Sequence, residues 1–268
     1  MADTTQQTVA ESSAAGPPRR YRGRIAMSVG LVLTGVVLVV TIGVRDPNPP
    51  SPAPPPAPPP SSVEPDQAPK SGAQVPRAGL AAPPDRPTVS DQAELDAWAA
   101  RVAGKTGLSP RLLSAYGRAE MWMNRQKPSC HLSWATLAAI GHLTSDKMRI
   151  APDGAVSGLP PGPPAGPDTD AGELDGDRAA DHKLGPLQLP PSAWRKYAER
   201  ANGDGKTPNP ANIDDAAFTT ARYLCSGADD LGTPAGWWRA ILFYNASVQY
   251  GQSAFVAADS YAADSVRP

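Results

Sequence analysis

The sequence predicts an all-α domain, and three observations support this prediction. Apolar residues recur at three- and four-residue spacing in the C-terminal two thirds of the chain. Ser109 before Pro110 and Thr233 before Pro234 each place a capping residue ahead of a proline at the first helical position. No segment alternates convincingly with a period of two. The helices are expected at Asp91–Lys105, Pro110–Arg125, Trp134–Arg149, Ser192–Ala201, Ile213–Cys225, Pro234–Ala246 and Gln249–Ala263.

The sequence of the N-terminal part is typical of a single-pass membrane anchor. Residues 1–24 are expected to form a disordered cytoplasmic tail, and residues 25–44 are uncharged and mostly apolar, long enough to span a membrane as a helix. A cleaved signal peptide is the alternative, but the apolar stretch is long for one and no clear cleavage site follows it. Four arginines precede the span, so the N-terminus is expected in the cytoplasm and the rest outside. The predicted location is the cell membrane.

Residues 45–89 read as a proline-rich linker outside the cell. Ten of the fourteen residues from Pro47 to Pro60 are proline, which favours an extended polyproline II conformation. At about 3.1 Å per residue, such a linker reaches on the order of 100 Å from the membrane. Residues 90–268 then form the folded domain, long enough for one core. The net charge of -1 and the lack of a long basic run exclude nucleic acid as an expected partner.

The central helix is expected to be the one that begins at Trp134. Leu137, Ile140, Gly141 and Thr144 continue one stripe from Trp134, and Ser133 is the expected N-cap. A side chain at Thr144 would face the interior or a groove beside it. Periodicity alone gives that threonine no special role.

The two cysteines, Cys130 and Cys225, predict one structural disulfide in an exported domain. A zinc site is not expected, because His131 beside Cys130 lacks a second spaced pair of ligands. The sequence predicts no cofactor and no metal.

A long irregular segment, residues 150–191, is expected to be a lid or binding loop. Its acidic run suggests calcium, but the spacing misses the EF-hand pattern, so a solvated loop is the preferred interpretation. The acidic side chains are Asp168, Asp170, Glu173, Asp175 and Asp177. A second stretch, residues 202–215, begins like a calcium loop. It carries Arg200 and Lys206 where oxygen ligands are needed.

Four stretches together resemble the membrane-bound lytic murein transglycosylases of the B type. They read CHLSWATLAAIGHLTSD, DTDAGELDGDRAADHKLGPLQLPPSAW, NPANIDDAAFTTARYLC and GWWRAILFYNAS. The resemblance covers about residues 110–263. Its three elements are the Ile-Gly helix, the Gly-Pro-x-Gln segment at Gly185–Gln188, and the pair Tyr244 and Asn245. It implies a lysozyme-like helical fold and cleavage of peptidoglycan strands between N-acetylmuramic acid and N-acetylglucosamine, ending in a 1,6-anhydro sugar. A single glutamate of raised pKa would act as acid and then base.

The family's catalytic glutamate stands in an Ile-Gly-x-x-Glu-Ser pattern, and this chain departs from it. Ile140, Gly141 and Ser145 match, but Thr144 occupies the glutamate position. A threonine hydroxyl is no general acid near neutral pH, and losing one costs about 10²- to 10⁴-fold in rate. None of the other acids of the domain, nor His142, is expected to replace it. The acids considered are Glu94, Glu120, Glu173, Glu199 and Asp146. Glu120 is expected to have an arginine or solvent as its partner.

The binding chemistry is retained. The resemblance assigns substrate binding to Ser145, Gln188, Tyr244 and Asn245, whose hydroxyls and amides suit sugar hydroxyl and N-acetyl groups. The alternative for Tyr244 is a partly buried helix residue whose hydroxyl bonds a neighbour.

Three functions follow. The first is a degenerate family member that binds peptidoglycan strands without cutting them, with other cell-wall enzymes as partners. The second is an active lytic transglycosylase with a surrogate acid. The third is a helical protein-interaction module without sugar binding.

Overall fold

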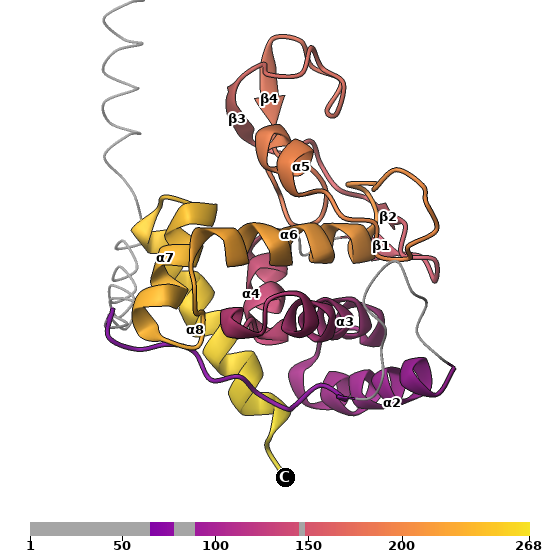
Figure 1. The fold of residues 1–268 in the computed structure, drawn as a ribbon, viewed down its shortest axis with the longest axis vertical. Coiled ribbons are helices and arrows are strands. Elements are labelled where there is room, and N and C mark those ends of the chain that lie inside the picture. Colours follow the sequence, from indigo (N-terminus) through magenta and orange to yellow (C-terminus); the bar gives the residue numbers. More distant parts are fainter. Residues whose placement is uncertain (1–64, 78–88, 145–147) are drawn as a thin grey trace, which may run out of the picture. The chain divides into compact units, whose positions relative to one another are not determined.

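A computed structural model describes residues 65–77, 89–144 and 148–268 (Figure 1). The predicted tail at 1–24, the predicted span at 25–44 and the proline run lie outside these residues, as does Ser145. Within the described ranges, no helix has both the length and the apolar character needed to cross a membrane.

The described domain is mostly helical, as the sequence predicted. Its seven α-helices are α2 (Val89–Thr106), α3 (Pro110–Gln126), α4 (Trp134–Thr144), α5 (Pro191–Tyr197), α6 (Ile213–Gly227), α7 (Pro234–Tyr244) and α8 (Val248–Ser265), and a 3₁₀ turn η1 covers Pro128–Cys130. The predicted caps are confirmed, because the hydroxyls of Ser109 and Thr233 accept hydrogen bonds from the N–H groups of Leu112 and Gly236. Most predicted helix ends lie within three residues of the observed ones.

Two helix predictions were too long. The central helix α4 ends at Thr144 and not at Arg149, because Arg149 already belongs to an extended strand. Helix α5 ends at Tyr197 instead of Ala201, since Ala198 leaves the helical conformation with a ψ of 132°. Propensity does not reveal either end, because the contacts of the folded chain override it there.

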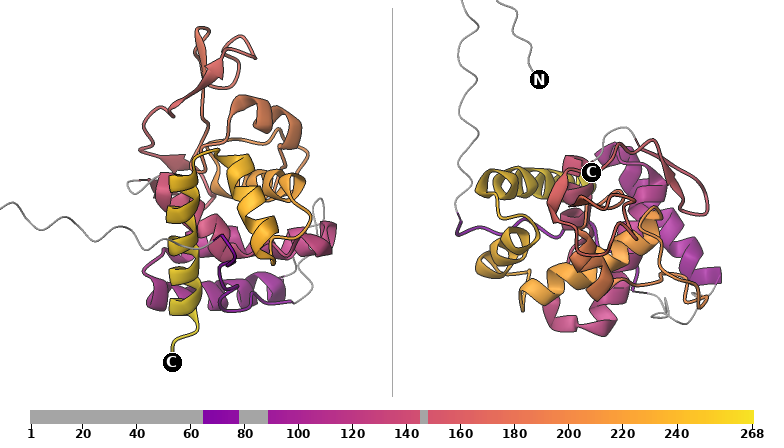
Figure 2. Two further views of the ribbon diagram at one scale, coloured as in Figure 1. Left: turned by 90° about the vertical axis from the view of Figure 1, so that its left-hand side faces the viewer. Right: turned by 90° about the horizontal axis from the view of Figure 1, so that it is seen from above.

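The expectation of no strands was wrong for the segment between α4 and α5. It holds two antiparallel hairpins: β1 (Arg149–Ile150) pairs with β2 (Val156–Ser157), and β3 (Pro164–Pro167) pairs with β4 (Ala180–His182). These strands have two to four residues, too few for an alternating pattern to be visible. Figure 2 shows the β3–β4 hairpin standing away from the helices.

Helix α4 lies at the centre of the domain. All residues from Trp134 to Gly141 are buried, and the helix packs against α3, α6 and α8. The hydroxyl of Ser133 accepts a 3.2 Å hydrogen bond from the N–H of Ala135, so the predicted cap is present. Burial on all sides explains why α4 reads as apolar around its whole circumference rather than along one stripe.

The described end of the predicted linker, residues 65–77, packs on the helical domain. We call it the strap. The indole N–H groups of Trp134 and Trp238 donate to the strap carbonyls of Ala73 and Gln67, at 3.1 and 3.0 Å. Val75 is buried. The strap is extended, as expected of linker, but its hydrogen bonds and its buried valine make it part of the domain.

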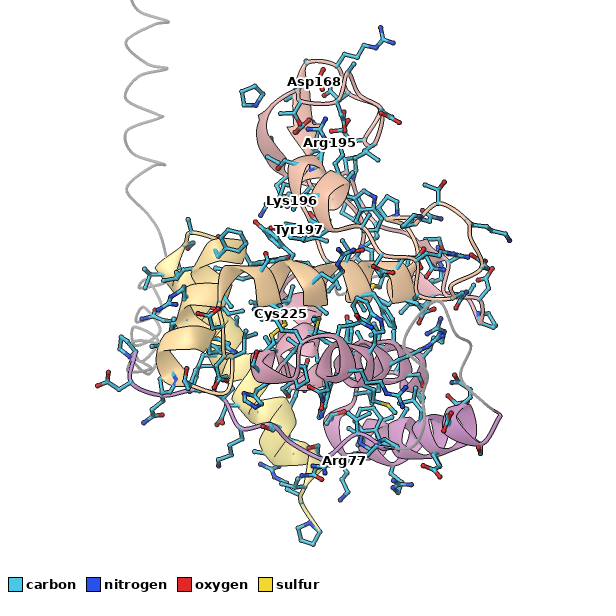
Figure 3. The ribbon with its side chains drawn as sticks, viewed as in Figure 1. Arg77, Asp168, Arg195, Lys196, Tyr197 and Cys225 are labelled. Atoms are coloured by element: carbon cyan, nitrogen blue, oxygen red, sulfur yellow. A yellow bond between two sulfur atoms is a disulfide. The ribbon has the colours of Figure 1, made fainter. Side chains whose placement is uncertain are left out.

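The disulfide between Cys130 and Cys225 is confirmed. It joins η1 to α6, with 5.7 Å between the Cα atoms, and both cysteines are buried (Figure 3). The bond closes a loop of 95 residues across the core.

Candidate functional site

The Gly-Pro-x-Gln segment, residues 185–188, lies against the C-terminal end of α4. The Thr144 hydroxyl lies 2.6 Å from the carbonyl oxygen of Pro186, to which it donates. The carbonyls of Ile140 and Gly141 are also within reach, each at 3.1 Å. The structure therefore brings together two of the predicted elements, which are 42 residues apart in sequence.

The glycine of the Ile-Gly pair permits close packing behind this site. A Cβ atom at Gly141 would lie 2.2 Å from the hydroxyl oxygen of Tyr116 and 3.5 Å from the Leu187 side chain. The Tyr116 hydroxyl is buried and has no hydrogen-bond partner among the described residues, and burial raises its pKa. Gly141 is therefore needed for α4 to approach both Tyr116 and the turn.

The turn at 185–188 is held in an uncommon conformation. Gly185 has a φ of 64°, and a Cβ there would lie 2.0 Å from the carbonyl of Pro210. Gln188 also has a positive φ, 51°, which is uncommon for a residue other than glycine. Its side-chain amide donates to the carbonyl of Gly185 at 2.9 Å. One hydrogen bond from the Gln188 side-chain amide thus stabilises the turn itself.

Tyr244, the last residue of α7, also supports this turn. It is buried, and its hydroxyl donates to the carbonyl of Leu187. Burial is the main cause that raises its pKa. The structure therefore places Tyr244 as the sequence alternative described, with its hydroxyl on a neighbour. Thr144 and Tyr244 bind consecutive carbonyls of the turn, those of Pro186 and Leu187.

Asn245 lies beside Tyr244 and is only partly buried. It ends α7, and its side-chain oxygen accepts a 3.1 Å hydrogen bond from the N–H of Ser247. The structure thus brings Thr144, Gln188 and Tyr244 together at the turn, whereas the hydrogen bonds of Asn245 among the described residues stay within its own segment.

Gln188 also lines a hollow of about 670 Å³ beside the turn, which we call the lobe pocket. Its walls come from β2, the 158–162 loop, the turn and the β3–β4 hairpin. The polar side chains that line it are those of Ser157, Asp175, Asp177, His182, Lys183 and Gln188. The volume lies within the range of small-ligand sites, roughly 300 to 1,000 Å³.

His182 links the walls of the lobe pocket. Its Nδ1 lies 2.8 Å from the carbonyl oxygen of Gly162, and its Nε2 lies 3.1 Å from Asp177 Oδ2. Both neighbours are acceptors, so the doubly protonated imidazolium is favoured. The hydrogen bond to Gly162 is the first cause that raises the pKa of His182, and Asp177 adds to it.

Asp175 and Asp177 are poorly suited to be general acids. The backbone N–H groups of Asp177 and His182 lower the pKa of Asp175. The backbone N–H of Ala179, followed by the His182 side chain, lowers the pKa of Asp177. A general acid needs a raised pKa to keep its proton near neutral pH. Both carboxylates are therefore ionised.

Glu120 has a raised pKa but lies far from Thr144. It accepts a 2.6 Å hydrogen bond from the N–H of Trp134, the first residue of α4, and burial raises its pKa to about 8. Thr144 is at the other end of α4, about 15 Å away along the helix at about 1.5 Å per residue. An arginine partner, one of the two expected, is not found among the described residues; the carboxylate accepts from the backbone of α4 and is only partly buried.

The remaining candidate acids do not reach the turn as donors either. Glu199 is paired with Arg222 at 2.8 Å, and Glu94 and Glu173 are exposed. His142 is exposed and makes an edge contact with Tyr261. Asp146 lies outside the described residues.

The acidic loop brings together Asp168, Asp170 and Asp181, whose carboxylate oxygens lie within 4.8 Å of one another. The sequence analysis included the first two and missed Asp181, which is in β4. Glu173, Asp175 and Asp177 are not part of this group. Arg195 donates to the carbonyl of Thr169 at 2.6 Å beside it, and Figure 3 shows Arg195 near Asp168.

In the second loop an arginine occupies the position of a cation. The Arg200 guanidinium donates to both oxygens of Asp204, each at 2.8 Å, and to Asp215 Oδ2 at 2.7 Å. Arg200 thus pairs with these carboxylates as a cation would, whereas the sequence interpretation placed it at the position of an oxygen ligand.

Sequence reasoning missed Tyr116, which lies against Gly141 of α4, and it missed His182 in the lobe pocket. His182 stands within the stretch that carries the resemblance, so its place beside the Gly-Pro-x-Gln segment was the available signal. Tyr116 gave no such signal.

Comparisons with family models, with curated proteins and with solved structures found no match to this chain.

Proposed function

We propose that this protein is a membrane-anchored, extracytoplasmic peptidoglycan-binding protein with a lysozyme-like fold of the lytic murein transglycosylase type, and that it does not cut the glycan. One observation carries the proposal. At the position of the expected glutamate, the Thr144 hydroxyl donates to the carbonyl of Pro186 at 2.6 Å. The group that would protonate the glycosidic oxygen is replaced by one that holds the turn.

The electrostatics of the described carboxyls support the lack of cleavage. Glu120 is the one described carboxyl with a raised pKa, and it lies at the far end of α4 from Thr144. Asp175 and Asp177, which line the lobe pocket, have lowered pKa values. Glycoside cleavage requires a positioned acid that keeps its proton near neutral pH.

The polar lining of the lobe pocket supports glycan binding. Gln188 and Lys183 offer amide and cationic donors, and the carboxylates of Asp175 and Asp177 offer acceptors for sugar hydroxyls. The retained turn keeps Gln188 at the edge of this hollow.

A sedimentation experiment tests the binding. Full-length protein is mixed with purified insoluble peptidoglycan, and the bound fraction is measured after centrifugation. The wild-type protein is expected to sediment with the glycan. Gln188→Ala is expected to bind about 2- to 13-fold more weakly, since a hydrogen bond contributes about 0.5–1.5 kcal/mol.

Gln249→Ala is the matched control, because Gln249 is exposed at the start of α8 and is outside the lobe pocket. Thermal unfolding of each variant separates loss of binding from loss of folding. Protein that stays in the supernatant at every glycan concentration contradicts the proposal and favours an interaction module.

A further inference from the structure

A second hollow, of about 560 Å³, lies between the strap and the N-terminal end of α4. We call it the strap pocket. One wall is the strap from Ser71 to Arg77, and the other is formed by α3 and by the chain that leads from η1 into α4. The α3 side chains that line it are Glu120, Met121, Asn124 and Arg125. It lies at the opposite end of α4 from the Thr144 site.

Glu120 presents an acid to this hollow without a cation partner. Its Oε2 accepts the hydrogen bond from Trp134, which caps the start of α4. In the described part of the chain, no basic side chain forms an ion pair with it. A partly buried carboxyl that lacks a cation favours a ligand that brings one.

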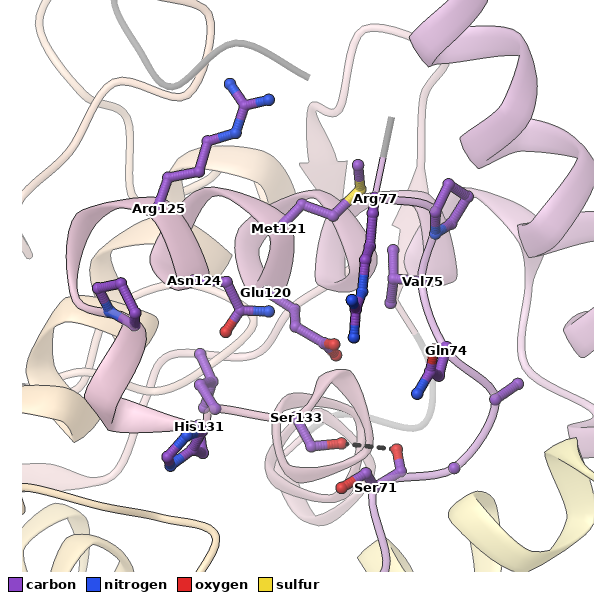
Figure 4. Close-up of a pocket in the computed structure, with 15 residues that line it drawn as sticks. Ser71, Gln74, Val75, Arg77, Glu120, Met121, Asn124, Arg125, His131 and Ser133 are labelled. Atoms are coloured by element: carbon purple, nitrogen blue, oxygen red, sulfur yellow. Dashed lines mark hydrogen bonds between the residues drawn. The ribbon is translucent and has the colours of Figure 1, made fainter. Parts of the chain in front are cut away.

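The strap supplies the opposite charge. Figure 4 shows Arg77 on the strap and Glu120 on α3 both pointing into the pocket, with the amides of Gln74 and Asn124 beside them. Arg125 points away from this group. The pocket thus has an acid on one wall and a guanidinium on the other, with neutral amides beside them.

We propose that the strap pocket binds a ligand that carries both an amine and a carboxylate, with the ammonium group on Glu120 and the carboxylate on Arg77. Guanidinium binds carboxylate through paired donors, which gives orientation as well as charge. Free amino acids of the lysine type and the diamino-acid residues of peptidoglycan peptides share this chemistry. The site is separate from the glycan site and does not depend on it.

Ionisation of Glu120 gives this site a pH dependence. With a pKa of about 8, Glu120 is mostly neutral at pH 7 and mostly ionised above pH 8. An amine like that of the lysine side chain has a pKa of about 10.4, so it stays protonated at both of these pH values. Binding is therefore expected to be roughly eightfold tighter at pH 8.5 than at pH 7, because only the ionised fraction binds. A site whose acid is ionised throughout would bind almost equally at these two pH values.

Calorimetric titration of the full-length protein with 6-aminohexanoate tests the proposal, with hexanoate and 6-aminohexanamide as ligands that each lack one charge. The complete ligand is expected to bind at least tenfold tighter than either. Glu120→Gln keeps an acceptor for the Trp134 N–H and is expected to weaken binding at least tenfold and to abolish the pH dependence. Arg77→Gln, at an exposed position, tests the other wall without disturbing the core. Arg101→Gln, at an exposed arginine of α2 outside the pocket, is the control and is expected to bind as the wild type does.

The proposal is overturned if the three ligands bind equally well, or if 6-aminohexanoate does not bind at pH 8.5. It is also overturned if both Glu120→Gln and Arg77→Gln bind as the wild type does. Soluble peptidoglycan fragments with and without their peptides distinguish the two sources of the ligand. Competition with 6-aminohexanoate by the peptide-bearing fragments alone assigns the pocket to peptides. Competition by neither assigns it to a free amino acid.

Discussion

Replacing both Cys130 and Cys225 with serine is expected to lower the free energy of unfolding by roughly 4 to 5 kcal/mol in the chain-entropy model. The bond closes a loop of 95 residues, and without it the unfolded chain gains the freedom of that loop. In the folded state the bond fixes η1, just before α4, to α6 on the other side of the core. Its loss therefore affects the position of the helix that carries Thr144.

Urea denaturation of the oxidised protein, the reduced protein and the double variant measures this effect. The two forms without the bond should unfold at the same, lower denaturant concentration. Ser129→Ala, next to Cys130 but exposed, is the control and should unfold like the wild type. If the free energies of unfolding of the oxidised and reduced proteins differ by less than about 1 kcal/mol, the unfolded chain is already constrained without the bond.

Replacing Asp215 with alanine is expected to cost about 3 to 5 kcal/mol of stability. It leaves two N–H groups without their acceptor, at about 1 to 3 kcal/mol each, and removes one of the two carboxylates that pair with Arg200. Asp215 is fully buried. Its carboxylate accepts hydrogen bonds from the N–H of Ala201 at 3.0 Å, the N–H of Asn209 at 2.9 Å and the Arg200 guanidinium at 2.7 Å. One side chain thus ties the second loop to the start of α6.

Chemical denaturation again gives the measurement, with Asp229→Ala as the control. Asp229 is exposed at the end of α6, and its replacement should change stability by less than about 0.5 kcal/mol. The double replacement of Arg200 and Asp215 by alanine should cost less than the sum of the two single changes, since the pair is coupled. Additive losses would mean that the loop does not depend on this pair.

The sequence predicted the helices well because their start signals are local. Ser109 and Thr233 cap the helices they precede, and proline follows each of them. The disulfide was predictable because a chain with two cysteines allows one pairing, and the domain was expected outside the cell.

The features that decide the site depend on contacts between distant segments. Nothing near Thr144 in the sequence reveals that its hydroxyl meets Pro186, or that Tyr116 lies behind Gly141. The strap is another case. Its composition reads as linker, and its place in the domain rests on the indoles of Trp134 and Trp238, more than 60 residues away along the chain.

The most direct test of the central claim is release of anhydro-muropeptides from purified peptidoglycan by the full-length protein, compared with Thr144→Glu. The account predicts that the wild-type protein binds the glycan and releases no anhydro product. Product formed by Thr144→Glu alone would show that the glycan-binding site is intact and that cleavage was lost at one position. Anhydro product released by the wild-type protein would contradict the account and would require a surrogate acid.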